Sequence, residues 1–246
     1  MIRLLVGLAL MPSSALTLLA AGRALALLAS RSSAAFPFLA GLLLAMASWL
    51  FLRYCAISDA GPVGWAGALS RRAYIFGHEL THALAAWSVG GSVLGFKVGE
   101  TGGHVDLSHS SAFIALAPYC VPIYTIVVIL GYRLFVWLKP AHSNSLLFLT
   151  LVGLTLAFHA LKTFEVIWDR TQPDLAQAGG VVFSLAWIGL ANGLVVLVLL
   201  KALFPDAITF VDDVRAVSDR TVVFWLWLWH FVKPLTTGFA SQLSHP

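Results

Sequence analysis

Residues 36–54 read FPFLAGLLLAMASWLFLRY, an apolar run that contains a single charge, Arg53. A helix rises 1.5 Å per residue, so this run is about 29 Å long, close to the roughly 30 Å of hydrocarbon in a bilayer. Because lipid offers the backbone no hydrogen bonds, a lone segment can cross it only as a helix. The stretch therefore predicts a transmembrane helix.

The composition extends this prediction to the whole chain. Of its 246 residues, 59% are hydrophobic and 11% are charged, whereas a soluble domain has about 25% charged residues. These proportions exclude a soluble globular domain, a disordered chain, a collagen and a disulfide scaffold. We expect an all-α polytopic membrane protein, a single membrane-embedded domain over residues 1–246, with five or six transmembrane helices in a lipid bilayer.

The net charge of +4 is spread thinly along the chain. Its largest basic cluster is the pair Arg71 and Arg72, so no nucleic-acid partner is expected. Basic residues instead orient membrane proteins by gathering on the cytoplasmic side. With six crossings, this rule predicts a multi-pass protein of the cell membrane with both termini in the cytoplasm. Cys55 and Cys120 lie beside or within apolar runs and are expected to be buried free thiols.

Polar or Gly- and Pro-rich stretches separate the other apolar runs. Residues 1–30 open like a signal peptide and are interrupted at Pro12-Ser13-Ser14; a broken first span is the alternative that we favour, because a multi-span chain follows. Residues 58–70 are expected to form a loop. Further membrane helices are expected over residues 71–89, 112–138 with kinks at Pro118 and Pro122, 146–164 and 179–204.

Residues 206–246 are expected to form a cytoplasmic or interfacial segment. The charged side chains of residues 206–220 fit a solvated loop. Residues 221–232 are apolar but too few to cross a bilayer, which favours an interfacial helix with Trp225, Trp227 and Trp229 at headgroup level.

Residues 78–82 read His-Glu-Leu-Thr-His within the helix expected over residues 71–89. His78 and His82 are four residues apart, so they share one helical face and can bind one Zn²⁺. Glu79 can then take a proton from a zinc-activated water that attacks a carbonyl. With 8 His and three Glu in the chain, roughly 0.003 chance occurrences of this motif are expected. The motif predicts a zinc centre with Glu79 as its catalytic residue.

A catalytic zinc usually has three protein ligands and an open position for water. Asp174 is the favoured third ligand, because it follows Pro173 and shortly precedes Gly179-Gly180 and a span, where a carboxylate can enter a helix bundle. A helix cap is its alternative role. Four residues remain as alternative third ligands: Asp169, Glu165, His159 and His104.

An H-E-x-x-H motif inside a membrane helix resembles the site-2 protease-type intramembrane metalloproteases. The likeness continues loosely through Gly102-Gly103-His104-Val105, a proline-bearing span and Gln172-Pro173-Asp174-Leu175. In that family an aspartate in an Asn-x-x-Pro-x-x-x-Leu-Asp-Gly pattern is the third ligand; the Leu-Asp-Gly order is absent here. The resemblance implies a metalloprotease-like core over residues 71–200, Zn²⁺ as cofactor, and hydrolysis of a peptide bond in or near a membrane-embedded segment of a protein substrate.

Two short strands, over residues 93–98 and 104–107, are expected to form a hairpin just after the metal helix. A membrane substrate must unwind before cleavage, and its freed backbone then needs hydrogen-bond partners. The edge of the hairpin can supply them, although a plain connecting hairpin is the alternative.

Two other functions remain as alternatives to the enzyme. One is a catalytically inactive, protease-like scaffold that binds membrane clients, against which the intact Glu79 argues. The other is an ion-coupled transporter, since intramembrane His, Glu and Asp can relay ions. The chain shows no internal repeat, which disfavours a transporter.

Overall fold

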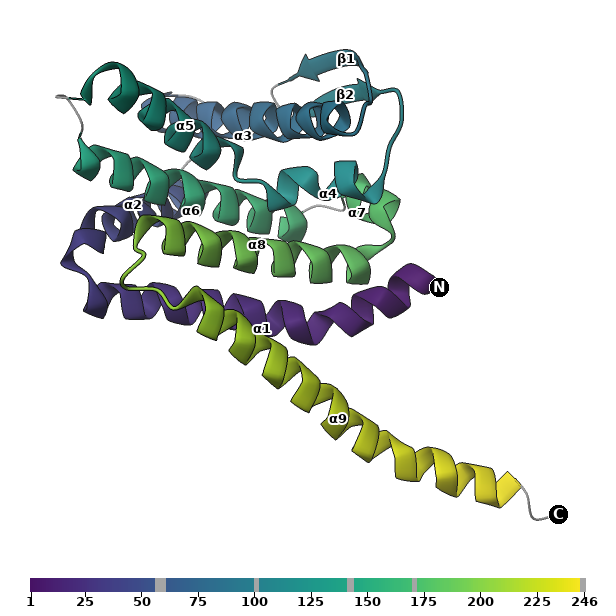
Figure 1. Ribbon diagram of the computed structural model, residues 1–246. Helices are drawn as coiled ribbons and strands as arrows, with labels where there is room; N and C mark the ends of the chain where they lie inside the picture. The colour runs from purple at the N-terminus through teal and green to yellow at the C-terminus, as the bar shows by residue number, and fades with distance from the viewer. Residues whose placement is uncertain (56–60, 100–101, 141–143, 170–171, 244–246) are drawn as a thin grey trace.

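The computed structural model describes residues 1–55, 61–99, 102–140, 144–169 and 172–243, with backbone alone for 55, 169 and 235–243. Helices dominate it, and one small sheet lies at one end of the bundle (Figure 1). In chain order the elements are α1 (Ile2–Arg31), η1 (Ser33–Ala35), α2 (Phe36–Cys55), α3 (Gly61–Ser88), β1 (Val93–Val98), β2 (Gly103–Leu107), α4 (Ala112–Cys120), α5 (Ile123–Leu138), α6 (Ser145–Asp169), α7 (Pro173–Ala178), α8 (Val181–Leu203) and α9 (Phe210–Leu243).

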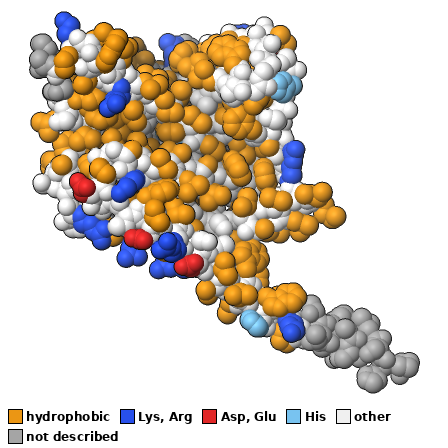
Figure 2. Space-filling model, viewed as in Figure 1, with side chains coloured by type: hydrophobic (Ala, Val, Ile, Leu, Met, Phe, Trp, Pro, Cys, Tyr) orange, Lys and Arg blue, Asp and Glu red, His pale blue; other side chains and the backbone are white. Residues whose placement is uncertain are grey.

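Helices α1, α2, α6 and α8 are each long and apolar enough to cross a membrane. Helices α4 and α5 meet at an angle of 67° and together make a fifth candidate span. Within the most apolar window of each long helix only 22–28% of residues are buried, so apolar side chains cover the outside of the bundle, as Figure 2 shows for one face. The described residues thus form a helical membrane protein with four or five candidate spans.

Small residues bring the helices into close pairs. Helix α1 packs along α8, and α2 packs along α6 (Figure 1). A Cβ atom added at Gly41 or Gly153 would collide with backbone of the partner helix, and one at Gly193 would lie 2.7 Å from the Thr17 side chain. Since lipid is as apolar as leucine, such close packing, rather than the hydrophobic effect, holds membrane helices together.

The bundle core joins both helix pairs. Phe38 of α2 is fully buried and its ring meets that of Phe204 edge-on, with centroids 5.8 Å apart. Leu28 of α1, Val152 of α6 and Leu197 of α8 complete the same cluster. This core holds the four helices α1, α2, α6 and α8 together.

The sequence prediction of where helices break is wrong in three places. Helix α1 runs through Pro12 without interruption, and α3 begins at Gly61, so residues 61–70 are helical rather than loop; residues 58–60 lie outside the described residues. Proline is tolerated in the first turn of a helix and within membrane helices, as at Pro62 and Pro12. Residues 210–220, predicted as loop, instead open the single helix α9.

The hairpin agrees with its prediction, and the span over residues 112–138 is broken at Pro122, as predicted, but not at Pro118. Strands β1 and β2 pair antiparallel, with a bulge between Val93 and Gly95. The span breaks between α4 and α5 because Pro122 has no N–H to donate, while Pro118 stays inside α4. Cys120 at the end of α4 is a buried free thiol, as predicted; the Cys55 side chain lies outside the described residues.

Candidate metal centre

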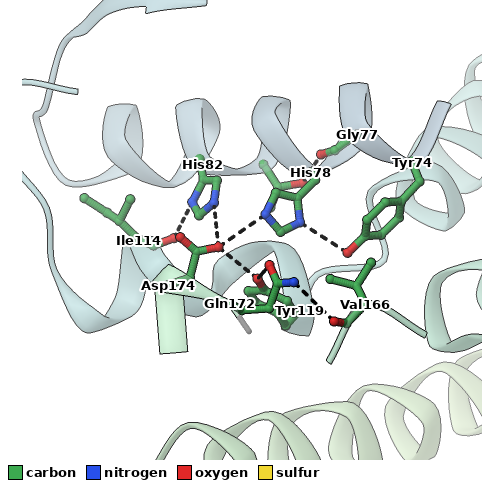
Figure 3. Close-up of polar contacts among 10 residues, drawn as sticks. Tyr74, Gly77, His78, His82, Ile114, Tyr119, Val166, Gln172 and Asp174 are labelled. Atoms are coloured by element: carbon green, nitrogen blue, oxygen red, sulfur yellow. Dashed lines mark hydrogen bonds and ion pairs between the residues drawn. The ribbon is translucent and has the colours of Figure 1, made fainter. Parts of the chain in front are cut away.

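His78 and His82 of α3 face Asp174 of α7, and all three side chains converge on one point (Figure 3). The Nε2 atoms of His78 and His82 lie 3.4 and 3.5 Å from Oδ2 of Asp174. Ligand atoms of the three residues lie within 4.8 Å of one another. Among the described residues this is the one group of three or more His, Cys, Asp or Glu side chains with such spacing, and it could hold a metal ion.

The two measured distances match the edges of a tetrahedral site. Ligand atoms at 2.0–2.1 Å from a zinc ion lie about 3.3–3.4 Å from one another when the geometry is tetrahedral. The separations of Asp174 Oδ2 from the two imidazole nitrogens, 3.4 and 3.5 Å, are close to that edge. The third edge, between the ligand atoms of the two imidazoles, is within 4.8 Å; three protein ligands would leave the fourth vertex of a tetrahedron open.

The hydrogen bonding of His82 fixes which ring nitrogen is available. Its Nδ1 lies 2.9 Å from the Ile114 carbonyl oxygen, and since a carbonyl only accepts, Nδ1 must carry the proton. Nε2 of the neutral ring therefore presents a lone pair toward the Asp174 carboxylate. A lone pair and an anionic oxygen repel each other unless a proton or a cation lies between them, so the contact requires either a second ring proton on His82 or a bound cation.

Aromatic rings surround His78. Its ring meets those of Tyr119 and His82 edge-on, with centroids 5.1 and 4.9 Å apart. On its far side Nδ1 lies 3.4 Å from the Tyr74 hydroxyl, one helical turn earlier. These contacts hold the imidazole so that Nε2 faces Asp174.

Asp174 comes from the six-residue helix α7, which begins with Pro173. Gln172 is the N-cap, so the alternative prediction of Asp174 as a cap is wrong. Tyr119 of α4 donates to Oδ2 of Asp174 at 2.9 Å. Burial alone would raise the pKa of this carboxyl, but in the absence of a cation the hydrogen bonds donated by the protonated imidazoles and by Tyr119 outweigh burial and hold the pKa well below its ordinary range.

Glu79 lies beside this group but outside it. It is 8% exposed and lines the same cavity, of about 930 Å³, as the three candidate ligands. Strand β2 runs directly over it: a Cβ atom added at Gly103 would lie 2.6 Å from Glu79 Cγ and 2.7 Å from Oε1. Only glycine at this position leaves room for the carboxylate next to the metal-ligand group.

The structure places three of the four alternative ligands elsewhere. His104 pairs with Asp106 at 2.6 Å on the exposed face of β2, and His159 lies 3.2 Å from Asn192 Oδ1 in the core. Glu165 accepts from Lys162 at 3.0 Å and from Trp49 Nε1 at 2.6 Å. The side chain of Asp169 lies outside the described residues.

Sequence reasoning missed Tyr119 and the network that holds it. The Tyr119 carbonyl loses its helical partner at the Pro122 break and accepts from Asn192 Nδ2 at 2.8 Å instead. His159 in turn bonds the same amide side chain. The available signal is Pro122, because a helix that ends before this proline leaves its last carbonyls, that of Tyr119 among them, in need of other donors.

Comparison of the chain with protein-family models, with curated proteins and with solved structures finds no match.

Replacing Tyr119 by phenylalanine should weaken metal binding while keeping the ring that packs on His78. The lost hydrogen bond orients a candidate ligand, and such changes typically lower metal affinity about 10- to 100-fold. Zinc affinity measured by competition with a chromogenic chelator tests this. The matched control is Tyr132→Phe, since Tyr132 stacks on Phe148 away from the site. Equal affinities of the two variants would contradict the role given to Tyr119.

Proposed function

We propose that the protein is a zinc-dependent intramembrane metalloendopeptidase that hydrolyses a peptide bond in or near a membrane-embedded segment of a protein substrate. The observation that carries the proposal is the convergence of His78, His82 and Asp174, with ligand atoms within 4.8 Å of one another and both imidazoles 3.4–3.5 Å from the Asp174 carboxylate, while Glu79 lines the same cavity. Two imidazoles and one carboxylate are a set that catalytic zinc uses in hydrolases.

Each residue has a distinct role in this proposal. His78, His82 and Asp174 hold the cation, which when bound lowers the pKa of a water and polarises the substrate carbonyl. Glu79 accepts one proton from the water as its oxygen bonds to the carbonyl carbon. It then returns that proton to the amide nitrogen as the C–N bond breaks, which leaves one new carboxyl and one new amine.

The hairpin offers the unwound substrate a strand edge. Gly99 N–H donates to the Gly102 carbonyl, so the alternation of an antiparallel ladder makes Gly103 and Val105 members of non-hydrogen-bonded pairs. Their own N–H and C=O groups therefore point away from β1. Consecutive residues of β2, Gly103 to Leu107, line the cavity while β1 does not, which supports pairing of the substrate with the free edge of β2.

A proline at Val105 should slow cleavage about fivefold, because it removes an outward N–H that would bond the substrate, worth about 1 kcal/mol. Val98→Pro is the matched control: it removes an outward N–H from β1, on the edge away from the cavity. The measurement is kcat/KM on one peptide substrate, with zinc content checked in both variants. Equal rates for the two variants would remove the substrate-pairing role of β2 and leave a connecting hairpin.

The experiment that tests the function uses purified full-length protein in lipid nanodiscs. A library of single-span membrane peptides is incubated with it, and products are identified by mass spectrometry. Cleavage that stops with a zinc chelator and returns with added Zn²⁺ would support the proposal. Stoichiometric zinc without cleavage of any peptide would point to a client-binding scaffold. We place the protein in the cell membrane. An even number of crossings, as with the four long candidate helices, puts both termini on one side, and the distribution of basic residues favours the cytoplasmic side.

A further inference from the structure

The helix that carries Asp174 is too short to hold itself in place. Helix α7 has six residues, and the last four carbonyls of any helix have no partner within it. The Leu175 carbonyl accepts from Gly180 N–H at 2.9 Å and from the buried Ser184 hydroxyl of α8 at 3.1 Å. The final carbonyls, of Gln177 and Ala178, have a different donor.

That donor is Arg3, near the amino terminus. Its Nη1 lies 3.0 Å from the Ala178 carbonyl oxygen and 3.4 Å from that of Gln177. A guanidinium at a helix C-terminus also meets the partial negative charge of the exposed carbonyls. The amino-terminal turn of α1 thus closes the end of a helix 174 residues later in the chain.

The two glycines that follow α7 let the backbone pack closely against Arg3. Gly179 has φ +133° and Gly180 has φ +98°, conformations that favour glycine. A Cβ atom added at Gly179 would collide with the Arg3 side chain, 3.2 Å from its Cβ and Cγ and closer still to Cδ. The stem of Arg3 therefore packs on the turn that its guanidinium bonds.

From these contacts we propose that Arg3 is a positioning residue for the metal ligand Asp174. Arg3 acts through α7. Together with Ser184 of α8, it fixes the C-terminal end of this helix. At the N-terminal end, Tyr119 of α4 fixes the Asp174 carboxylate. The inference depends on the proposed metal site, and it makes the first turn of α1 part of the support of that site.

Helix α1 offers its own matched control. Arg31, at the opposite end, makes the same kind of contact, from Nη1 to the Ala207 carbonyl oxygen at 3.4 Å, but Ala207 lies between α8 and α9, away from α7. Arg3→Gln and Arg31→Gln each remove one guanidinium from α1. Arg3→Lys keeps a positive donor with less reach.

Two measurements on full-length protein in nanodiscs test the proposal. In metal-free protein, amide hydrogen exchange over residues 173–180 should be about tenfold faster in Arg3→Gln than in wild type or Arg31→Gln. Zinc affinity should fall about tenfold in Arg3→Gln, with Arg3→Lys between, and the visible spectrum of the Co²⁺-loaded protein should change in Arg3→Gln alone. Thermal unfolding of the metal-free variants separates these effects from a general loss of stability.

The outcomes separate the two proposals. Exchange and zinc affinity equal in Arg3→Gln and Arg31→Gln would overturn the role of Arg3. Wild-type protein that binds zinc no better than Asp174→Asn would overturn the metal site alone, and the exchange of α7 in the metal-free protein would still decide whether Arg3 holds this helix.

Discussion

Glu79→Gln protein is expected to keep its zinc and to cleave a membrane peptide about 10²- to 10⁴-fold more slowly than wild type. The amide has the size of the carboxylate, so it fits beneath Gly103 of β2, where a Cβ atom would already lie 2.6 Å from Glu79 Cγ. It cannot accept a proton from water, so the loss belongs to the chemical step. Since Glu79 lies outside the group of His78, His82 and Asp174, zinc affinity should stay within about twofold.

The measurement pairs single-turnover cleavage with zinc content on the same preparation. Asp212→Asn is the control, the same acid-to-amide change in the first turn of α9, and its rate should equal that of wild type. A Glu79→Gln protein that cleaves at the wild-type rate would exclude Glu79 as the base. Loss of zinc from the variant would instead assign Glu79 to metal binding.

The pair of histidines could be predicted from the sequence, because residues one helical turn apart lie on the same face of a helix. His78 and His82 are four residues apart on α3, and any helix through them places both rings on one face. Asp174 could only be favoured, since the sequence carries several carboxylates near membrane helices and no spacing rule joins α7 to α3. The close approach of Asp174 Oδ2 to both imidazoles needs the folded bundle.

Two of the three failed predictions of helix breaks, at Pro12 and over residues 61–70, concern glycine and proline. Gly61-Pro62 and Gly64 read as loop residues by rules drawn from soluble proteins, yet Gly64 is buried inside α3. In lipid, a glycine permits close packing of neighbouring elements, and a proline's lost hydrogen bond can be met locally. The same physics makes Gly41 and Gly153 contact points between α2 and α6. In this chain, glycine and proline therefore also occur inside helices and at contacts between them.

Tyr119 shows a second kind of limit. From the sequence, an aromatic residue in an apolar run is expected to be a packing residue. The role of the Tyr119 hydroxyl is visible only in the fold, where it lies 2.9 Å from Asp174 Oδ2. The network behind it, from His159 through Asn192 to the Tyr119 carbonyl, joins α6, α8 and α4. Its members are far apart in the sequence, so periodicity cannot connect them. The broken span thus serves the site by freeing a carbonyl that fixes Tyr119 to α8.

Alanine at His78, His82 or Asp174 should each lower zinc affinity by two to three orders of magnitude. Structural zinc binding of about 10–16 kcal/mol over four ligands gives about 2.5–4 kcal/mol per ligand, which corresponds to roughly 10²- to 10³-fold in affinity. The matched control is His104→Ala, which removes an exposed imidazole that lines the same cavity and pairs with Asp106; its affinity should remain that of wild type. Competition with a fluorescent chelator measures all four variants, and circular dichroism confirms that each keeps its helices. If His104→Ala lost zinc while Asp174→Ala kept it, the third ligand would come from β2 rather than α7, and the bond of Tyr119 to Asp174 would serve only to fix α4 to α7.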